Sequence, residues 1–248
     1  MLPIGTLVFT IAVIFAAAIV RGFSGFGFSL LSITALTLAM PQSQVVPSIF
    51  MLEIAASLHL IPGIWRDIDW RSLRPLLLGC LLGTPIGVLV LANVPPAPMA
   101  VAMAVFVIAS AVLMLRGVRL TQSPSPAATV AVGALSGLIN GAFGAGGPPV
   151  ILFYFSTPAA AAIGRASIIA YFLGTDSLGL AWDAAHGLLT RQTVLQALIW
   201  LAPLLLGVAL GARGFHRVSE ATFRRWVLRL LILIAVISAA KATIIPGL

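Results

Sequence analysis

The chain has 248 residues, of which 60% are hydrophobic and only 8% are charged. Because soluble domains carry about 25% charged residues, this composition excludes a soluble globular protein. The net charge of +8 comes from 14 Lys and Arg residues against six Asp and Glu residues. Nearly all the basic residues lie at the ends of apolar runs, as they do beside membrane helices. We therefore predict an all-α, polytopic membrane protein whose partner is the lipid bilayer and not nucleic acid.

The first half of the chain contains four apolar stretches. They are expected at Pro3 to Met40, Pro47 to Ile64, Pro75 to Ala92 and Ala97 to Leu115. The first stretch has 38 residues, and as one helix it would measure about 57 Å, nearly twice the ~30 Å hydrocarbon core. It must therefore break and fold back, and the glycines between Arg21 and Gly27 mark the place.

The same order of stretches returns in the second half. An apolar run from Ala127 to Phe143 breaks at Gly144 to Pro149 and resumes from Val150 to Ser156, and further runs follow at Ile163 to Trp182, Thr193 to Ala212 and Phe223 to Ile245. The halves match at an offset of 117 to 124 residues, which pairs Glu53 with Asp176, Met40-Pro41 with Thr157-Pro158, and Gly83–Gly87 with Gly207–Gly211. Tandem repeats are a common plan of secondary transporters. The predicted units are a first membrane repeat at 1–115, a connector at 116–126 and a second repeat at 127–248.

Charge in the loops predicts opposite orientations for the two repeats. The loop from Asn93 to Pro96 is uncharged, whereas its counterpart in the second half is the most basic and contains Arg213, Arg217, Arg224 and Arg225. Because positive loops stay in the cytoplasm, the repeats are predicted to be inverted, with a cytoplasmic connector and both termini outside the cytoplasm. Each broken stretch must then enter and leave the membrane on the same side. The short run from Val150 to Ser156 favours a shallow hairpin, at least in the second half.

The two glycine-rich breaks form the predicted substrate site. A broken helix directs backbone N–H groups and the positive end of its dipole toward the gap, which suits an anion. Irregular backbone persists at membrane depth only where protein or a water-filled cavity satisfies its polar groups. Ser24 and Asn140 add side-chain donors beside the gaps. Glycines also allow helices to pack closely without any ligand, but two clusters in corresponding places, each with a polar residue, favour a substrate site.

Four ionisable residues complete the candidate site. Arg21 adjoins the first break and is the candidate for contact with an anion, with an interfacial anchor as the alternative. Arg165 is a secondary candidate, for which snorkelling to a headgroup and an inward role are equally weighted. Glu53 and Asp176 are the acidic residues within the predicted membrane runs. They are candidates for proton coupling, and the alternative is a structural partnership with Arg21, Arg165 or His59.

An enzymatic alternative comes from two short motifs. Gly22-Phe23-Ser24-Gly25 matches the GxSG string of rhomboid proteases, and Ala185-His186-Gly187 resembles their histidine segment. An intramembrane serine hydrolase would need the side chains of Ser24 and His186 within hydrogen-bond reach, yet they lie 162 residues apart in different halves. The three histidines form no HExxH motif and the chain has no Walker or Rossmann string. We therefore predict no enzyme, no metal site and no cofactor.

The paired glycine motifs resemble those of the sulfite exporter TauE/SafE family. They are Arg21-Gly22-Phe23-Ser24-Gly25-Phe26-Gly27 and Gly141-Ala142-Phe143-Gly144-Ala145-Gly146-Gly147-Pro148-Pro149. Chain length, duplication and the prolines Pro41 and Pro158 fit as well, so the resemblance covers essentially the whole chain. The first motif departs from the family pattern at Phe26-Gly27-Phe28, where a run of glycines is commoner. The resemblance implies a bacterial or archaeal cytoplasmic-membrane protein linked to sulfite, sulfoacetate and other organosulfonates.

The predicted function is a secondary transporter that exports small sulfur-containing anions by alternating access around a site between the two broken stretches. Its substrate-binding residues are predicted to be Arg21, Ser24, Gly25, Phe26, Gly27, Asn140, Phe143, Gly144, Gly146 and Gly147. A carrier of another small oxyanion or carboxylate, and a scaffold subunit without transport, are the alternatives. An inside-negative potential already favours anion exit, so export needs no coupling ion, whereas uptake would use Glu53 and Asp176. A homo-oligomer stays open, because lipid-facing and partner-facing surfaces look alike in sequence.

Overall fold

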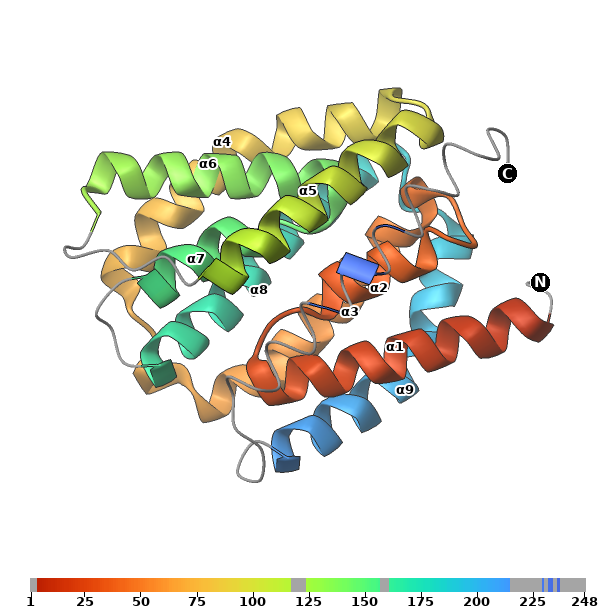
Figure 1. Ribbon diagram of the computed structural model, residues 1–248, viewed down its shortest axis with the longest axis horizontal. Helices are drawn as coiled ribbons and strands as arrows, with labels where there is room; N and C mark the ends of the chain where they lie inside the picture. The colour runs from red at the N-terminus through yellow and green to blue at the C-terminus, as the bar shows by residue number, and fades with distance from the viewer. Residues whose placement is uncertain are drawn as a thin grey trace.

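The computed structural model describes residues 4–116, 124–156 and 161–214, together with Arg229, Ile232, Leu233 and Val236. Every regular element in these ranges is helical (Figure 1). The α-helices are α1 (Ile4–Ser24), α2 (Phe28–Leu36), α3 (Gln42–Leu60), α4 (Trp70–Asn93), α5 (Pro96–Arg116), α6 (Pro126–Phe143), α7 (Gly147–Ser156), α8 (Ala161–Ala185) and α9 (Arg191–Gly214). Two short 3₁₀ turns, η1 (Ile61–Gly63) and η2 (Trp65–Asp67), join α3 to α4.

Five of the described helical segments are long and apolar enough to cross a bilayer. They are α1, α3 with η1, α4, α6 and α9, which have 18 to 24 residues each. At 1.5 Å per residue, these lengths correspond to about 27–36 Å, enough for the ~30 Å hydrocarbon core. The leucine and isoleucine side chains exposed on α4 and α9 suit contact with lipid; they include Leu78, Leu82, Ile86, Leu198, Ile199 and Leu206. The chain is therefore a multi-pass membrane protein.

The described helices coincide with the apolar runs predicted from the sequence, and both predicted breaks are present. The main differences are in length: α3 begins at Gln42, ahead of Pro47, and α4 begins at Trp70, ahead of Pro75. α2 ends at Leu36, short of Met40, and α8 extends past Trp182 to Ala185. The last predicted run, Phe223 to Ile245, lies outside the described residues apart from four positions. Of the four arginines in the predicted basic loop, only Arg213 lies within the described residues.

Each break turns at glycines with left-handed backbone. Gly25 and Gly27 have φ of 80° and 92°, and Gly144 has φ of 65°, a region that costs residues with a Cβ about 1–2 kcal/mol. The helices that follow, α2 and α7, have nine and ten residues, or about 14 and 15 Å, half the thickness of the core. A full-length helix followed by a half-length helix running back therefore opens each half (Figure 1).

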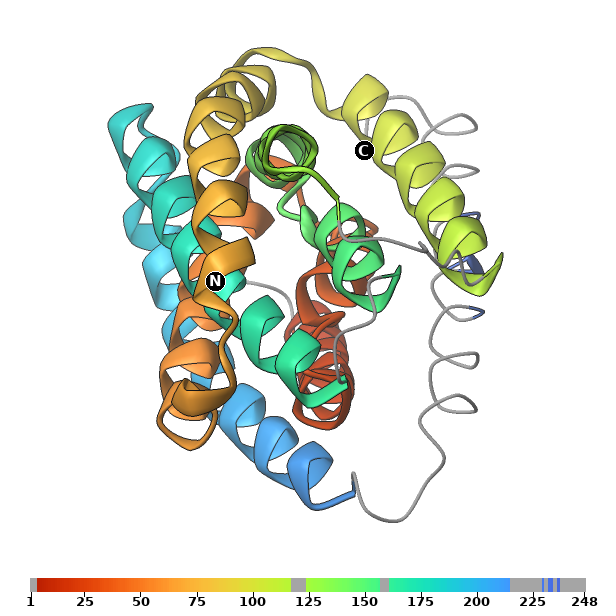
Figure 2. The same ribbon diagram turned by 90° about the vertical axis from the view of Figure 1, so that its left-hand side faces the viewer.

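Helix packing follows the same plan in both halves. α1 packs along α9, and their counterparts α6 and α4 pack along each other (Figures 1 and 2). α3 and α8 also correspond to each other and are in contact. In addition, α3 contacts α9, and α8 contacts α4. Figure 1 shows α1 and α6 running in opposite directions, and likewise α4 and α9. Each of the two closely packed pairs therefore joins a helix from the first half to a helix from the second.

Glycines bring these paired backbones together. A Cβ placed on Gly79, Gly83 or Gly87 of α4 would collide with a backbone carbonyl oxygen of α6, and the glycines Gly133, Gly137 and Gly141 of α6 face the backbone of α4 in the same way. Gly22, Gly207 and Gly211 form the corresponding contact between α1 and α9. Small residues allow this close approach in membranes, where apolar burial does not drive association. The four-residue spacing of these glycines is visible in the sequence and would have indicated both contacts.

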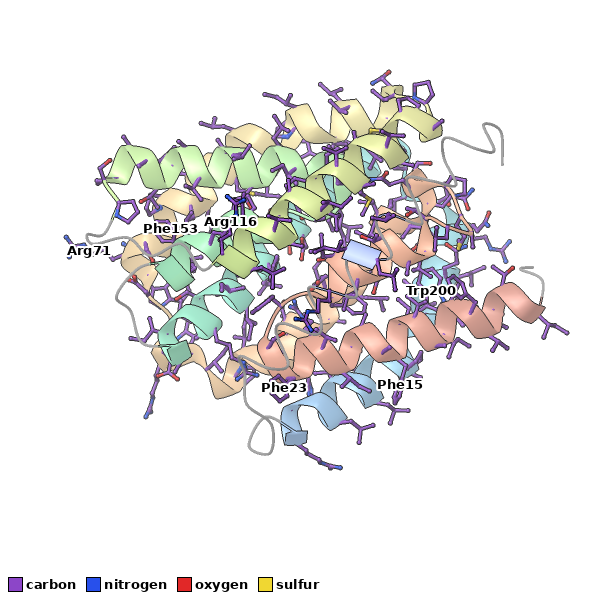
Figure 3. The ribbon with its side chains drawn as sticks, viewed as in Figure 1. Phe15, Phe23, Arg71, Arg116, Phe153 and Trp200 are labelled. Carbon is purple, nitrogen blue, oxygen red and sulfur yellow. The ribbon has the colours of Figure 1, made fainter. Side chains whose placement is uncertain are left out.

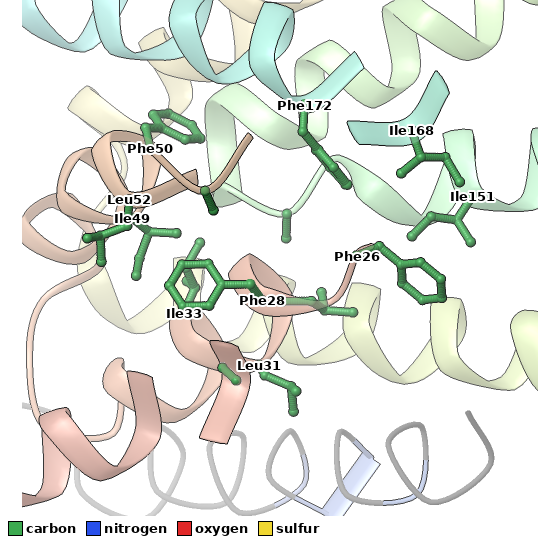
Figure 4. Packing of buried hydrophobic residues seen from close by; sticks show 14 of the residues in the cluster. Phe26, Phe28, Leu31, Ile33, Ile49, Phe50, Leu52, Ile151, Ile168 and Phe172 are labelled. Atoms are coloured by element: carbon green, nitrogen blue, oxygen red, sulfur yellow. The ribbon is translucent and has the colours of Figure 1, made fainter. Parts of the chain in front are cut away.

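Larger side chains fill the space around the paired helices. Trp200 of α9 is buried against α1, where its indole N–H donates to Thr10 Oγ1 at 3.2 Å (Figure 3). Nearer the breaks, Phe26, Phe28 and Phe172 belong to one buried cluster with residues of α3 and α7 (Figure 4). This apolar packing surrounds the polar residues of the breaks and keeps them out of contact with lipid.

Candidate functional site

A buried ion pair lies beside the first break. Arg21 is in the last turn of α1, and its carbonyl oxygen accepts the Gly25 N–H at 2.7 Å where the helix ends. Its guanidinium Nη1 pairs with Glu53 Oε2 of α3 at 2.5 Å, and Nη2 donates to Ser57 Oγ at 2.7 Å. Glu53 and Ser57 are four residues apart and therefore share one face of α3. The Arg21 and Glu53 side chains are 0% and 1% exposed, so the pair is closed off from both sides of the membrane.

Glu53 also holds the beginning of α2. Its second oxygen, Oε1, accepts the backbone N–H of Ser29 at 3.1 Å, and Ser29 lies in the first turn of α2. The first N–H groups of a helix have no partner within the helix, and the helix dipole makes this end positive. The carboxylate thus lies between a guanidinium and a helix N-terminus, which is the place where the sequence predicts an anion.

The second break has a neutral version of this arrangement. Asn140 precedes Gly144 by four residues, as Arg21 precedes Gly25, and its carbonyl oxygen accepts the Gly144 N–H at 2.7 Å. Its side-chain Nδ2 donates to Asp176 Oδ1 of α8 at 2.9 Å, and its Oδ1 accepts the Gly146 N–H at 3.1 Å. Asn140 therefore connects the loop of the second break to the buried carboxylate on α8.

One face of α8 connects the two breaks. Phe172 and Asp176 are four residues apart and lie on the same side of the helix. The guanidinium carbon of Arg21 lies 5.4 Å from the centroid of the Phe172 ring, within the range of a cation–π contact. Gly147, at the second break, approaches the same ring closely enough that a Cβ would lie 2.9 Å from its edge. Arg21 and Asp176 are both buried along this face of α8, so the ionisable residues of both halves lie near one helix.

Two of the predicted polar site residues have their hydrogen bonds directed toward neighbouring backbone. The Ser24 hydroxyl lies 2.7 Å from the Val20 carbonyl oxygen and 2.8 Å from that of Phe26, so it stabilises the turn of the first break. Arg165 is half-buried, and its Nη2 donates to the Gly22 carbonyl oxygen at 3.2 Å. Its side chain also packs against Gly25. Arg165 therefore reaches the first break from α8, rather than extending only toward a lipid headgroup.

The aromatic residues predicted for the site differ in position. Phe26 is buried within the cluster around the first break (Figure 4). Phe143 is half-buried and stacks on Phe106 of α5, with ring centroids 6.1 Å apart. The structure brings together four residues of the predicted site. They are the carboxylates Glu53 and Asp176, and the residues Arg21 and Asn140 that precede the glycine turns. Ser57 and Phe172, which contact Arg21, were not predicted; the spacing of Ser57 four residues after Glu53 was an available signal.

The residues of the enzymatic alternative are engaged elsewhere. His186 is exposed, its Nδ1 lies 2.9 Å from the Trp182 carbonyl oxygen, and its ring lies beside the Trp182 ring. Ser24 is held by the backbone of the first break, and the described residues contain no hydrogen bond between Ser24 and His186. Across the same part of the chain, no group of three His, Cys, Asp or Glu side chains could hold a metal ion.

Comparison with known proteins assigns the chain to a family. Residues 10–237 match the family described as Sulfite exporter TauE/SafE. The chain belongs to this family. It is 28% identical over 220 residues to the "Probable sulfite/organosulfonate exporter TauE" of Cupriavidus necator, an alignment that covers 86% of this chain and 84% of that protein. No solved structure matches the chain.

Membership in the TauE/SafE family establishes the general class. The family consists of transporters and not of enzymes, which agrees with the apolar helices of this chain and excludes the serine hydrolase. It also supports anion transport in general. The buried cluster at the breaks is then the part of this TauE/SafE protein whose chemistry suits an anion, because it combines a guanidinium, a helix N-terminus and amide donors.

Proposed function

We propose that this TauE/SafE protein is a secondary transporter that moves small sulfur-containing anions, such as sulfite or sulfoacetate, out of a bacterial cell across the cytoplasmic membrane. The observation that carries the proposal is that the Arg21 guanidinium and the first turn of α2 converge on one carboxylate at the first break. A geometry that holds a carboxylate also suits the oxygens of a sulfite or sulfonate group. The curated relative is named as a probable exporter of such anions.

The substrate is proposed to bind between the two breaks. Arg21 supplies the positive charge and the first turn of α2 supplies backbone N–H groups, while Asn140 is the donor from the second break. The residues that shape the two turns, and with them the pocket, are Ser24, Gly25, Phe26, Gly27, Phe143, Gly144, Gly146 and Gly147. Arg165 is a secondary contact that approaches from α8. Because the central residues are almost completely buried, access requires a rearrangement of the surrounding helices.

Alternating access is proposed to arise from an inverted repeat. The opposite directions of α1 and α6, and of α4 and α9, support the inversion (Figure 1). The interlocked glycines make α1–α9 and α4–α6 the closely packed pairs, so movement of the two sequence halves as separate bodies would have to separate backbones in close contact. We therefore propose that these two mixed pairs stay intact and that the helices of the breaks, with α3 and α8, move between them.

Anion binding and anion flux test this function. The purified protein is titrated with sulfite, sulfoacetate, sulfate, phosphate and acetate while its thermal unfolding is followed, and uptake of labelled sulfite is measured in proteoliposomes under a potential. A ligand at about 100 times its Kd should stabilise the protein by ~2.7 kcal/mol. The Arg21→Gln/Glu53→Gln double variant removes both charges of the pair together and should lose the response. Arg71→Ala, which changes an exposed arginine at the start of α4 (Figure 3), should keep it.

The anion that stabilises the protein decides the substrate class. Stabilisation by sulfite or sulfoacetate that disappears in the double variant supports the proposal. Stabilisation only by phosphate or acetate would keep an anion carrier and discard the sulfur assignment. No stabilisation and no flux with any of these anions would contradict the function, and would favour a subunit without transport.

A further inference from the structure

The Glu53 carboxylate satisfies the donors of the proposed substrate site from within the protein. One of its oxygens pairs with Arg21 Nη1 and the other accepts the Ser29 N–H of α2. We propose that Glu53 is a tethered competitor, whose carboxylate occupies the anion position when substrate is absent and is displaced when a sulfite or sulfonate binds. This inference rests on the proposed function and specifies how binding at that same site is regulated.

The donors at the site exceed what a carboxylate can use. Both Glu53 oxygens are engaged, yet the buried Nε of Arg21 has no hydrogen-bond acceptor among the described residues. A guanidinium presents five N–H donors in a fixed fork, and a sulfonate presents three oxygens where a carboxylate presents two. A sulfonate can therefore replace both Glu53 contacts and keep a third oxygen for another donor. The additional contacts explain how a dissolved substrate can displace the Glu53 carboxylate, although this carboxylate is tethered next to the same donors.

Displacement must also balance charge. Arg21 and Glu53 are neutral as a pair, and a bound monoanion would take over the neutralisation of Arg21. Glu53 would then be left as an uncompensated buried charge, which is strongly unfavourable. The balanced step is that one anion and one proton enter together, the anion pairs with Arg21, and Glu53 leaves the guanidinium as a neutral carboxylic acid. Binding of the anion is thereby coupled to uptake of one proton.

The charged groups around Glu53 point to this carboxylate as the proton acceptor. Arg21 pairs with it from α1. On α8, Asp176 is buried and Arg165 donates to the Gly22 carbonyl oxygen at the first break, while α2 contributes only the Ser29 N–H and has no ionisable side chain. On its own helix, His59 is exposed near the end of α3. The arginines of α4, α5 and α9 lie at or near the ends of those helices. Within the described residues, Arg21 is thus the cation that directly stabilises the ionised form.

The experiment compares anion affinity in three forms of the full-length protein in detergent, by calorimetric titration with sulfite and with methanesulfonate. Methanesulfonate keeps its charge between pH 5.5 and 8, so its binding reports titration of the protein alone. Glu53→Gln keeps the size of the side chain and an acceptor for the Ser29 N–H but removes the competing charge. The Kd of this variant should be lower than that of the wild type by about 10- to 100-fold, the range for one charge-assisted hydrogen bond. Asp176→Asn is the comparison variant: it removes the other buried carboxylate of the site, which contacts neither Arg21 nor Ser29, and should raise the affinity less than Glu53→Gln does.

The pH dependence provides a second test that needs no mutation. Wild-type protein should bind methanesulfonate more tightly as the pH falls, because protonation of Glu53 releases the site. The dependence should be absent in Glu53→Gln and present in Asp176→Asn. A Kd in Glu53→Gln that equals or exceeds the wild-type value would overturn the tethered competitor. So would an equal gain in affinity in Asp176→Asn, since the effect would then be one of general charge.

Anion binding by the wild-type protein separates the two proposals. If the wild type binds the anions and Glu53→Gln binds them no better, the transporter stands and the competitor is wrong. If neither protein binds either anion at any pH, both proposals are wrong. A pH-independent Kd in the wild type would overturn the proton-coupled displacement even if the Glu53 variant failed to fold.

Discussion

The two breaks use the same backbone device with different charges. Each has a left-handed glycine, and each has a residue four positions earlier that reaches a buried carboxylate on another helix. At the first break that residue is Arg21 and the carboxylate is Glu53, which itself holds the start of α2. At the second break it is Asn140, whose amide lies between Asp176 and the Gly146 N–H. The first carboxylate therefore has a cationic partner and the second has an amide partner.

The difference in charge gives the two breaks different chemistry. If Glu53 moves away, a full positive charge remains at the first break and can bind another anion. If Asp176 moves away, only an amide donor remains, which orients a ligand without neutralising it. In the proposed site, the first break would therefore bind the charge of the substrate, and the second break would shape the site and connect it to α8. Three substitutions test the comparison, in order of expected effect.

The largest effect is expected from Arg21→Ala. It leaves the buried Glu53 without its cation, and breaking a buried ion pair costs about 3–5 kcal/mol of unfolding free energy. Chemical unfolding in detergent measures the loss. Arg21→Gln/Glu53→Gln should recover most of it, because neutralising both partners removes the buried charge. A loss below about 1 kcal/mol from Arg21→Ala would show that the pair is not the main stabilising contact of the first break.

A smaller effect is expected from Asn140→Ala. The Gly146 N–H loses its acceptor and Asp176 loses a donor, and an unsatisfied buried polar group costs about 1–3 kcal/mol. Asn93→Ala is the matched control, since Asn93 is exposed and donates only to the Leu89 carbonyl oxygen within its own helix. It should change unfolding by about 0.5 kcal/mol or less. If Asn140→Ala were as costly as Arg21→Ala, the contrast between a charged and a neutral break would be wrong.

The smallest effect is expected from Gly27→Ala, which tests the backbone of the first break. Gly27 has φ of 92°, and the nearest atom to an added Cβ is Val20 Cγ1 at 3.4 Å. The cost is therefore one of conformation and not of collision, about 1–2 kcal/mol. Gly63→Ala, with no positive φ and no atom within 4 Å of an added Cβ, should be nearly neutral. Equal unfolding free energies for the two variants would mean that the left-handed turn at Gly27 is dispensable.

The helices and breaks were predictable because they depend on neighbouring residues. Runs of about 20 apolar residues form helices in a bilayer, since each backbone group must be satisfied within its own segment. The same reasoning located both turns, because only glycine adopts the left-handed backbone cheaply. The length of the stretch from Val150 to Ser156 indicated a partial crossing, and α7 is indeed too short to span the core.

The partners of the polar residues were predictable only in part. The sequence singled out Arg21, Glu53, Asn140 and Asp176, because charged and amide groups are rare at membrane depth. It left Glu53 with several candidate roles and partners. The structure decides among the partners: Glu53 pairs with Arg21, while Arg165 donates to the carbonyl oxygen of Gly22. Phe143 was placed at the site from its position beside a glycine, yet its ring stacks on Phe106 of α5.

The amino-acid sequence was sufficient to predict a multi-pass helical protein with two glycine breaks and with charged residues at membrane depth. The pairing of α1 with α9 and of α4 with α6, and the ion pair between Arg21 and Glu53, became visible only in the folded protein. The physical reason is that a bilayer dictates the length and hydrogen bonding of each helix locally. Lateral contacts between equally apolar helices depend instead on close backbone approach and a few buried polar bonds, which join residues far apart in the chain.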